Sequence, residues 1–182
     1  MAEVFEVRRH APRGQGKGLS AQGVELAKRA SETLLGNYQA LYTSPKQRCI
    51  ETLQAFGFET YKVIPEFATL PSKLEEHQEK VDQLQERAGC SLLEAYLAIP
   101  ATRLVLEEFG GSFFDRVCEL ADELRPGRNA LAVSHGGSIE PAVLAAMPDW
   151  DLETMGGPLG ECEAALFRFE NKVFTGVDIL RL

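Results

Sequence analysis

Residues 130–133, Ala-Leu-Ala-Val, form an uninterrupted apolar run that leads directly into Ser134 and His135. Such a run is typical of a β-strand buried on both faces, because a strand with one wet face alternates apolar and polar residues. A strand of this kind needs helices packed against both of its faces. The run therefore predicts a parallel sheet enclosed between two helical layers.

The rest of the chain alternates strand and helix patterns, as this arrangement requires. One helix is predicted after the N-cap candidate Ser20, and another with Ser44 as N-cap and Pro45 at its first position. A later helix is predicted to break at Gly110 and Gly111. Strands are predicted at residues 3–7, 40–43, 61–64, 130–133, 163–169 and 173–180.

This pattern predicts the class of fold. We expect an α/β three-layer sandwich, with a mostly parallel central sheet and helices on both faces. With 182 residues, the chain is expected to form a single domain over residues 1–182. Its helical middle, residues 66–111, is expected to form a small cap region.

The composition excludes several classes of partner. The net charge of −8 argues against nucleic acid. No apolar run approaches the ~20 residues that a membrane helix needs, so no membrane partner is expected. The four cysteines are widely spaced and form no metal-binding or redox pair, which favours a reduced, cytoplasmic protein.

Basic residues and histidines stand where the predicted strands end. Arg9 and His10 follow the first strand, His135 follows the apolar run, and Arg48 falls in the first turn of the helix after the second strand. Because parallel strands end at one edge of a sheet, these side chains are expected to converge on a phosphate pocket there. Arg8 alternates with Arg9 along the strand, so it is expected to face the other side in a structural salt bridge.

Four short segments carry a recognisable set of motifs. They read Arg-His at residues 9–10, Leu-Ser-Ala-Gln-Gly-Val-Glu-Leu-Ala at 19–27, Thr-Ser-Pro-Lys-Gln-Arg-Cys-Ile-Glu-Thr at 43–52 and Val-Ser-His-Gly-Gly at 133–137. In this order they resemble motifs of the histidine phosphatase superfamily, the phosphoglycerate mutase-like proteins. Ala11 departs from the family's Arg-His-Gly motif. The chain resembles a small, phosphatase-type member of that superfamily.

The resemblance implies a role for each matching residue. His10 would be the nucleophile that becomes a phosphohistidine, and Arg9, Arg48 and His135 would hold the phosphate oxygens. Arg13 would add a further phosphate contact, as in the Arg-His-Gly-x-Arg form of the acid phosphatase branch. The arrangement implies no cofactor and no metal ion.

The leaving group needs a proton donor, and two carboxylates are candidates. Glu66 follows the third predicted strand, where the mutase-like branch of the family carries its acid, although the residues after Glu66 differ from that branch. Glu140, one helical turn beyond Gly136 and Gly137, is the alternative.

The predicted function is hydrolysis of a phosphomonoester or a phosphoprotein, including phosphohistidine. A phosphomutase of the same family is an alternative that the modest cap disfavours, because a mutase must shield its phosphoenzyme from water. A catalytically silent phosphate-binding module is another, although binding alone needs no nucleophile such as His10. A metallohydrolase is disfavoured because the arginines would repel a cation.

Overall fold

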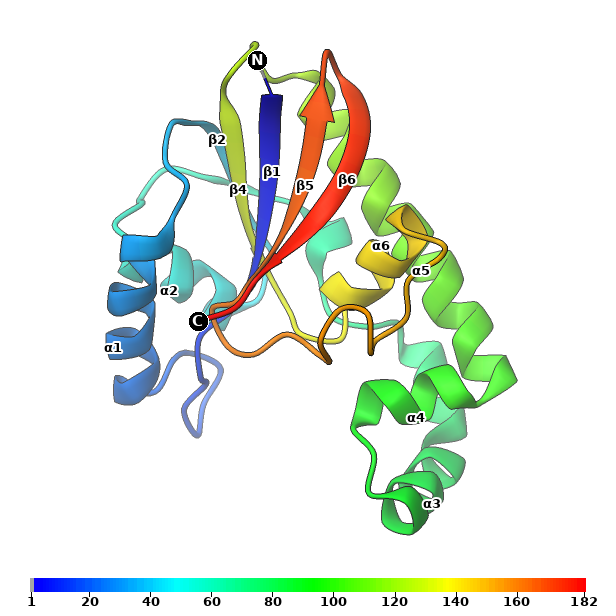
Figure 1. Ribbon diagram of the computed structural model, residues 1–182. Helices are drawn as coiled ribbons and strands as arrows, with labels where there is room; N and C mark the ends of the chain where they lie inside the picture. The colour runs from blue at the N-terminus through cyan, green and yellow to red at the C-terminus, as the bar shows by residue number, and fades with distance from the viewer. Residues whose placement is uncertain (1) are drawn as a thin grey trace.

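The computed structural model describes residues 2–182, in which a single six-stranded sheet runs through the molecule in the order β3-β2-β4-β1-β5-β6 (Figure 1). β4 pairs in parallel with both β1 and β2, and β2 pairs in parallel with β3. β5 and β6 extend the sheet by antiparallel pairing beyond β1. The strands are β1 Ala2–Arg9, β2 Tyr38–Thr43, β3 Lys62–Val63, β4 Asn129–Ser134, β5 Ala164–Glu170 and β6 Val173–Leu180.

Helices cover both faces of the sheet, as Figure 1 shows, with α1 and α2 on one side and α5 and α6 on the other. The predicted fold class, a mostly parallel sheet between two helical layers, is therefore confirmed. The α-helices are α1 Ala21–Ala30, α2 Gln47–Ala55, α3 Gln78–Ala88, α4 Leu92–Ala98, α5 Pro100–Asp122 and α6 Ile139–Ala146. Three short 3-10 helices are η1 Ser31–Thr33, η2 Pro65–Phe67 and η3 Ser72–His77. None of these helices, within residues 2–182, has the length and apolarity that a membrane crossing needs.

The predicted cap region, residues 66–111, contains η3, α3, α4 and the first half of α5. In Figure 1, α3 and α4 extend past the end of the sheet at which β1 ends. That a cap function belongs to this region, within a single domain, stays a prediction.

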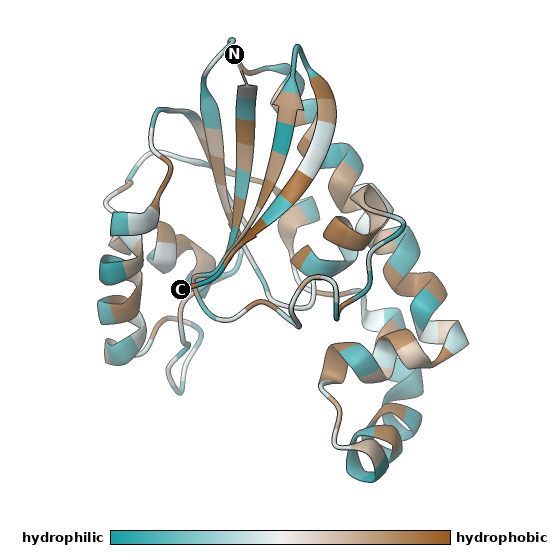
Figure 2. Cartoon of the chain, viewed as in Figure 1, coloured by the Kyte–Doolittle hydropathy of each residue, from teal (hydrophilic) through white to brown (hydrophobic). Residues whose placement is uncertain are grey.

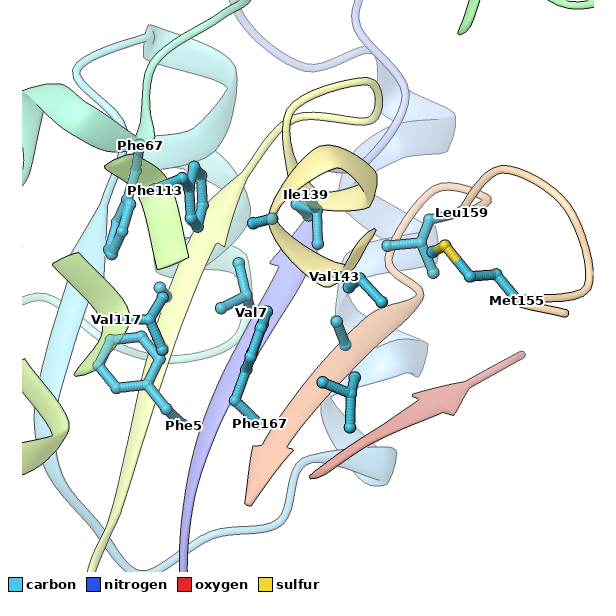
Figure 3. Packing of buried hydrophobic residues seen from close by; sticks show 14 of the residues in the cluster. Phe5, Val7, Phe67, Phe113, Val117, Ile139, Val143, Met155, Leu159 and Phe167 are labelled. Atoms are coloured by element: carbon cyan, nitrogen blue, oxygen red, sulfur yellow. The ribbon is translucent and has the colours of Figure 1, made fainter. Parts of the chain in front are cut away.

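The central strand β4 explains how one sheet supports two cores. Ala130 and Ala132 belong to the core on the α5 and α6 side, whereas Leu131 and Val133 belong to the core on the α1 and α2 side. All four side chains are fully buried, as the apolar run predicts. Figure 3 shows the first core, in which aromatic rings from β1, β5, η2 and α5 pack together. Figure 2 shows hydrophobic and hydrophilic bands alternating along the helices, as expected when each has a buried and a solvent-facing side.

Two consecutive arginines at the end of β1 point to opposite faces of the sheet. Arg8 is fully buried, and its Nε lies 2.5 Å from Oε1 of the equally buried Glu6. It also donates hydrogen bonds to the carbonyl oxygens of Thr33 and Cys162. The predicted structural salt bridge of Arg8 is confirmed, and strand alternation leaves Arg9 on the other face.

Helix α5 corrects one sequence prediction, because it continues through Gly110 and Gly111 without a break. The reason is contact with α6 rather than backbone flexibility. A Cβ atom at Gly110 would lie 2.3 Å from the carbonyl oxygen of Pro141, whereas one at Gly111 would meet nothing within 4 Å. At Gly110 the two helices that cover this face of the sheet thus lie too close together for a larger residue.

This difference makes the glycine pair a matched test of packing. Gly110→Ala is expected to lower the free energy of unfolding by about 1–3 kcal/mol, because the helices must move apart. Gly111→Ala is expected to raise it by about 0.5–1 kcal/mol, because alanine favours the helix and the site is open. Urea unfolding curves measure both, and equal effects of the two substitutions would contradict the packing role.

Candidate active site

The carboxyl ends of three adjacent parallel strands bring the predicted site residues together. His10 directly follows β1, His135 follows β4, and Arg48 lies in the first turn of α2, shortly after β2. The backbone amide of His10 donates to the Ser134 carbonyl at 2.9 Å, which ties the ends of β1 and β4 together. The imidazole rings of His10 and His135 are then 5.3 Å apart, centre to centre.

The guanidinium group of Arg48 lies between the two imidazoles and hydrogen-bonds to both. Its Nε is 2.9 Å from Nε2 of His10, and its Nη2 is 3.0 Å from Nδ1 of His135. An arginine can only donate hydrogen bonds, so both of these ring nitrogens must be unprotonated acceptors. The opposite nitrogen of each neutral ring therefore carries the proton. In His10, this is Nδ1, which lies 2.7 Å from the carbonyl oxygen of Ala11.

Burial beside cations keeps both imidazoles neutral. Burial lowers the pKa of His10 to about 4, and the charges of Arg48 and Arg9 act in the same direction. Burial, followed by the charge of Arg48, lowers the pKa of His135 to about 3. At neutral pH, Nε2 of His10 is therefore unprotonated and carries the lone pair that accepts from Arg48, which is the form of histidine that can act as a nucleophile.

Arg9 approaches the same edge and is held by the loop before β5. Its Nη1 donates to the Leu159 carbonyl at 2.5 Å, and its Nη2 lies 3.3 Å from Oε1 of Glu161. Its Nε is buried and has no hydrogen-bond partner among residues 2–182. A Cβ atom at Gly136 would lie 2.7 Å from that Nε, so the glycine lets the loop after β4 approach the guanidinium. An anion bound in the site could accept a hydrogen bond from this nitrogen.

Arg13 is exposed in the loop between β1 and α1, which a bridge between Arg13 and Leu19 closes. Burial lowers the pKa of Arg48, and the charge of Arg13 adds to that effect. The charge of Arg13 therefore acts on Arg48. Its role as a phosphate ligand stays a prediction.

The two candidate acids differ sharply in environment. The side chain of Glu66, in η2, is 48% exposed, and its Oε1 lies 3.8 Å from Nε of Arg116. Glu140 is fully buried, and its two oxygens accept the backbone amides of Gly137 at 2.6 Å and Leu159 at 2.9 Å. Burial raises the pKa of Glu140, while these amides act in the opposite direction. Within residues 2–182, neither carboxylate hydrogen-bonds to either site imidazole.

Two residues beside His135 escaped the sequence prediction. Ser44 does not cap α2, which begins only at Gln47; its Oγ lies 2.8 Å from Nε2 of His135. Cys49 is fully buried, with its Sγ 3.5 Å from the same nitrogen. Their positions in the sequence do place them near the predicted site, because Ser44 follows directly after β2 and Cys49 adjoins Arg48. Only the fold brings both against a ring that lies more than eighty residues further along the chain.

Paired imidazoles and guanidinium groups at the edge of a covered parallel sheet define an anion site of the kind that handles phosphoryl groups. The sequence model of the histidine phosphatase superfamily (branch 1) matches residues 6–178. The chain belongs to this superfamily, and the prediction of a histidine-type phosphatase is confirmed at this level.

Solved structures of phosphatases share the fold over nearly their whole length. The phosphoserine phosphatase of Entamoeba histolytica has a TM-score of 0.68 at 15% identity, over 99% of this chain and 98% of that chain. A mycobacterial glucosyl-3-phosphoglycerate phosphatase has a TM-score of 0.62 at 16% identity, over 100% and 99%. The alpha-ribazole phosphatase of Shigella flexneri has a TM-score of 0.63 at 16% identity, over 100% and 96%. No curated protein sequence matches this chain significantly.

The shared guanidinium predicts how the two imidazoles titrate. In a His77→Gln background, which leaves only His10 and His135, proton NMR is expected to give midpoints near 4 and near 3. Arg48→Met is expected to move both midpoints upward, because it removes a cation that disfavours each imidazolium. Wild-type midpoints close to the ordinary value of about 6.5 would contradict this account of the site.

Proposed function

We propose that this protein hydrolyses phosphomonoesters through a phosphohistidine formed on His10. The observation that carries the proposal is the position of Arg48, with one N–H on the lone pair of His10 Nε2 and another on His135 Nδ1. A phosphoryl group entering between these atoms would receive the arginine N–H groups on its oxygens and face the nucleophilic lone pair. The Ala11 carbonyl, which holds the proton on Nδ1, keeps that lone pair on Nε2.

The reaction then takes two balanced steps. In the first, Nε2 of His10 bonds to phosphorus while the bond from phosphorus to the leaving oxygen breaks, and that oxygen takes a proton from the general acid. In the second, a water oxygen bonds to phosphorus, the acid recovers a proton from that water, and the P–N bond breaks to release phosphate and His10. Arg9, Arg48 and His135 hold the phosphate oxygens throughout, with Arg13 at the rim.

Glu66 is the better supported donor of that proton. Ser134, which precedes His135, donates from its hydroxyl to the carbonyl oxygen of Phe67 at 2.9 Å, so η2 lies against the site. The carboxylate of Glu66 is half exposed and can exchange protons with water. In contrast, both oxygens of Glu140 accept hydrogen bonds from backbone amides. Glu140 would have to break one of these bonds to give a proton to the leaving group.

A small phosphorylated metabolite is the best supported class of substrate. The similar structures are named as a phosphoserine phosphatase, a glucosyl-3-phosphoglycerate phosphatase and an alpha-ribazole phosphatase. A phosphoprotein would be a second class of substrate. The net charge of −8 disfavours nucleic acid. Four free cysteines suit the reducing cytoplasm as the site of action.

The central test is the loss of His10. His10→Ala is expected to lower phosphatase turnover by roughly three orders of magnitude or more, because it removes the group that forms the phosphohistidine. His77→Ala, a change outside the site, serves as the control and should retain turnover. Rapid quenching of the wild type should trap a phosphoenzyme that is labile to acid and stable to alkali. Turnover by His10→Ala at the control rate would refute the mechanism.

The proton donor is tested with leaving groups of different acidity. Glu66→Gln is expected to slow an alkyl phosphate about 10²-fold, yet slow p-nitrophenyl phosphate far less, because nitrophenolate leaves without a proton. Glu119→Gln is the matched control, since Glu119 is the other carboxylate that pairs with Arg116. Equal losses with both substrates, or equal losses in both variants, would exclude Glu66 as the acid.

A further inference from the structure

Ser44 and Cys49 form a fully buried polar cluster beneath the ring of His135, and the reaction described above uses neither side chain. Ser44 Oγ is 2.8 Å from Nε2 of His135, and Cys49 Sγ is 3.5 Å from the same atom. The Cys49 thiol also reaches the Ser134 carbonyl at 3.5 Å. His135 is itself 3% exposed, so water has little access to this side of the ring.

The direction of these hydrogen bonds follows from which groups must donate. Nδ1 of His135 accepts from Arg48, so the neutral ring carries its proton on Nε2. The Nε2–H therefore donates to Ser44 Oγ, and the hydroxyl proton of Ser44 points away from Nε2. Burial raises the pKa of Cys49 to about 12, against the effect of Arg48 and of a hydrogen bond from Ser44. Cys49 thus stays a thiol, which can donate to the fixed Ser134 carbonyl.

We propose that Ser44, supported by Cys49, is a positioning residue that accepts from Nε2–H of His135, in the tautomer that Arg48 imposes, and so keeps Nδ1 turned toward the phosphate. This inference rests on the proposed function, because it assigns Nδ1 to the phosphoryl group. When phosphate takes the Arg48 N–H groups, Nδ1 can bind one proton from the solvent and donate it to a phosphate oxygen. Nε2–H keeps its bond to Ser44 in both states, so the ring does not need to turn.

The choice of a hydroxyl partner has a consequence for charge. The cations that face His135 are Arg48 and Lys46 from the start of α2 and Arg9 from β1, with His10 beside them. A carboxylate in the place of Ser44 would stabilise the imidazolium whether or not an anion is bound. A neutral hydroxyl orients the ring without doing so, and leaves protonation to depend on the arrival of an anion.

The test reads the tautomer directly, on the resting protein. In a His77→Gln background, nitrogen-15 NMR at neutral pH is expected to show His135 protonated on Nε2 in the wild type. Ser44→Ala is expected to lose the hydrogen bond of the Nε2 proton, seen as an upfield shift and faster exchange of that proton, and to bind inorganic phosphate about tenfold more weakly, as measured by calorimetry. Ser44→Thr, which keeps the hydroxyl, should retain both properties, and Ser44→Cys should be intermediate if threonine does not fit.

Two results would overturn the inference. One is a wild-type His135 that is protonated on Nδ1, which needs no variant to detect. The other is a Ser44→Ala variant in which either the resonance of the Nε2 proton or the phosphate affinity stays at the wild-type value. The NMR and calorimetry measurements do not depend on turnover. Unchanged activity in His10→Ala would therefore refute the proposed function, and the NMR result would still test the role of Ser44.

Discussion

The Arg48 guanidinium, held between two imidazoles, is the interaction on which the site depends. Its donors impose complementary tautomers, with the proton of His10 on Nδ1 and that of His135 on Nε2. The same cation opposes protonation of either ring, which keeps a nucleophilic lone pair available at neutral pH. Moving Arg48 by one residue along α2 would turn its fork away from both rings, so the start of this helix at Gln47 matters for the site.

Contacts on both faces of β1 fix the surroundings of that fork. On one face, the buried pair of Arg8 and Glu6 anchors the strand, and Arg8 also holds the carbonyl oxygen of Cys162. On the other face, Arg9 is held by the Leu159 carbonyl, while the amide of Leu159 is held by Glu140. Because Glu140 also accepts from Gly137, this one carboxylate links the loop after β4 to the loop before β5. Its burial is explained by this structural function.

Local sequence rules were sufficient for residues whose positions follow from a strand. The ends of two predicted strands placed His10 and His135 at one edge of a parallel sheet, and alternation assigned Arg8 and Arg9 to opposite faces. The same rules failed where a contact joins elements distant in sequence. Local rules predict that Gly110 breaks the helix, whereas in the structure it packs against the carbonyl oxygen of Pro141 within a continuous helix.

Ser44 is the most instructive of these failures. A serine before a proline is a good N-cap by local criteria, but the partner of Ser44 is His135, ninety-one residues away in the chain. No local pattern encodes that partner, because it arises only when β2 and β4 pair in parallel register.

The charges in the site relate these separate contacts to the binding of an anion. In the structure two arginines face two neutral imidazoles, and Glu161 offsets only part of the positive charge through Arg9. A phosphate dianion would compensate both guanidinium groups and would thereby weaken the field that opposes protonation of His135. Under the proposed function, a doubly charged anion would compensate more of this positive charge, to which Lys46 adds, than a monoanion or a carboxylate would. Selectivity for a terminal phosphate would then follow from electrostatics and from the direction of a few hydrogen bonds, with little need for an enclosing cap.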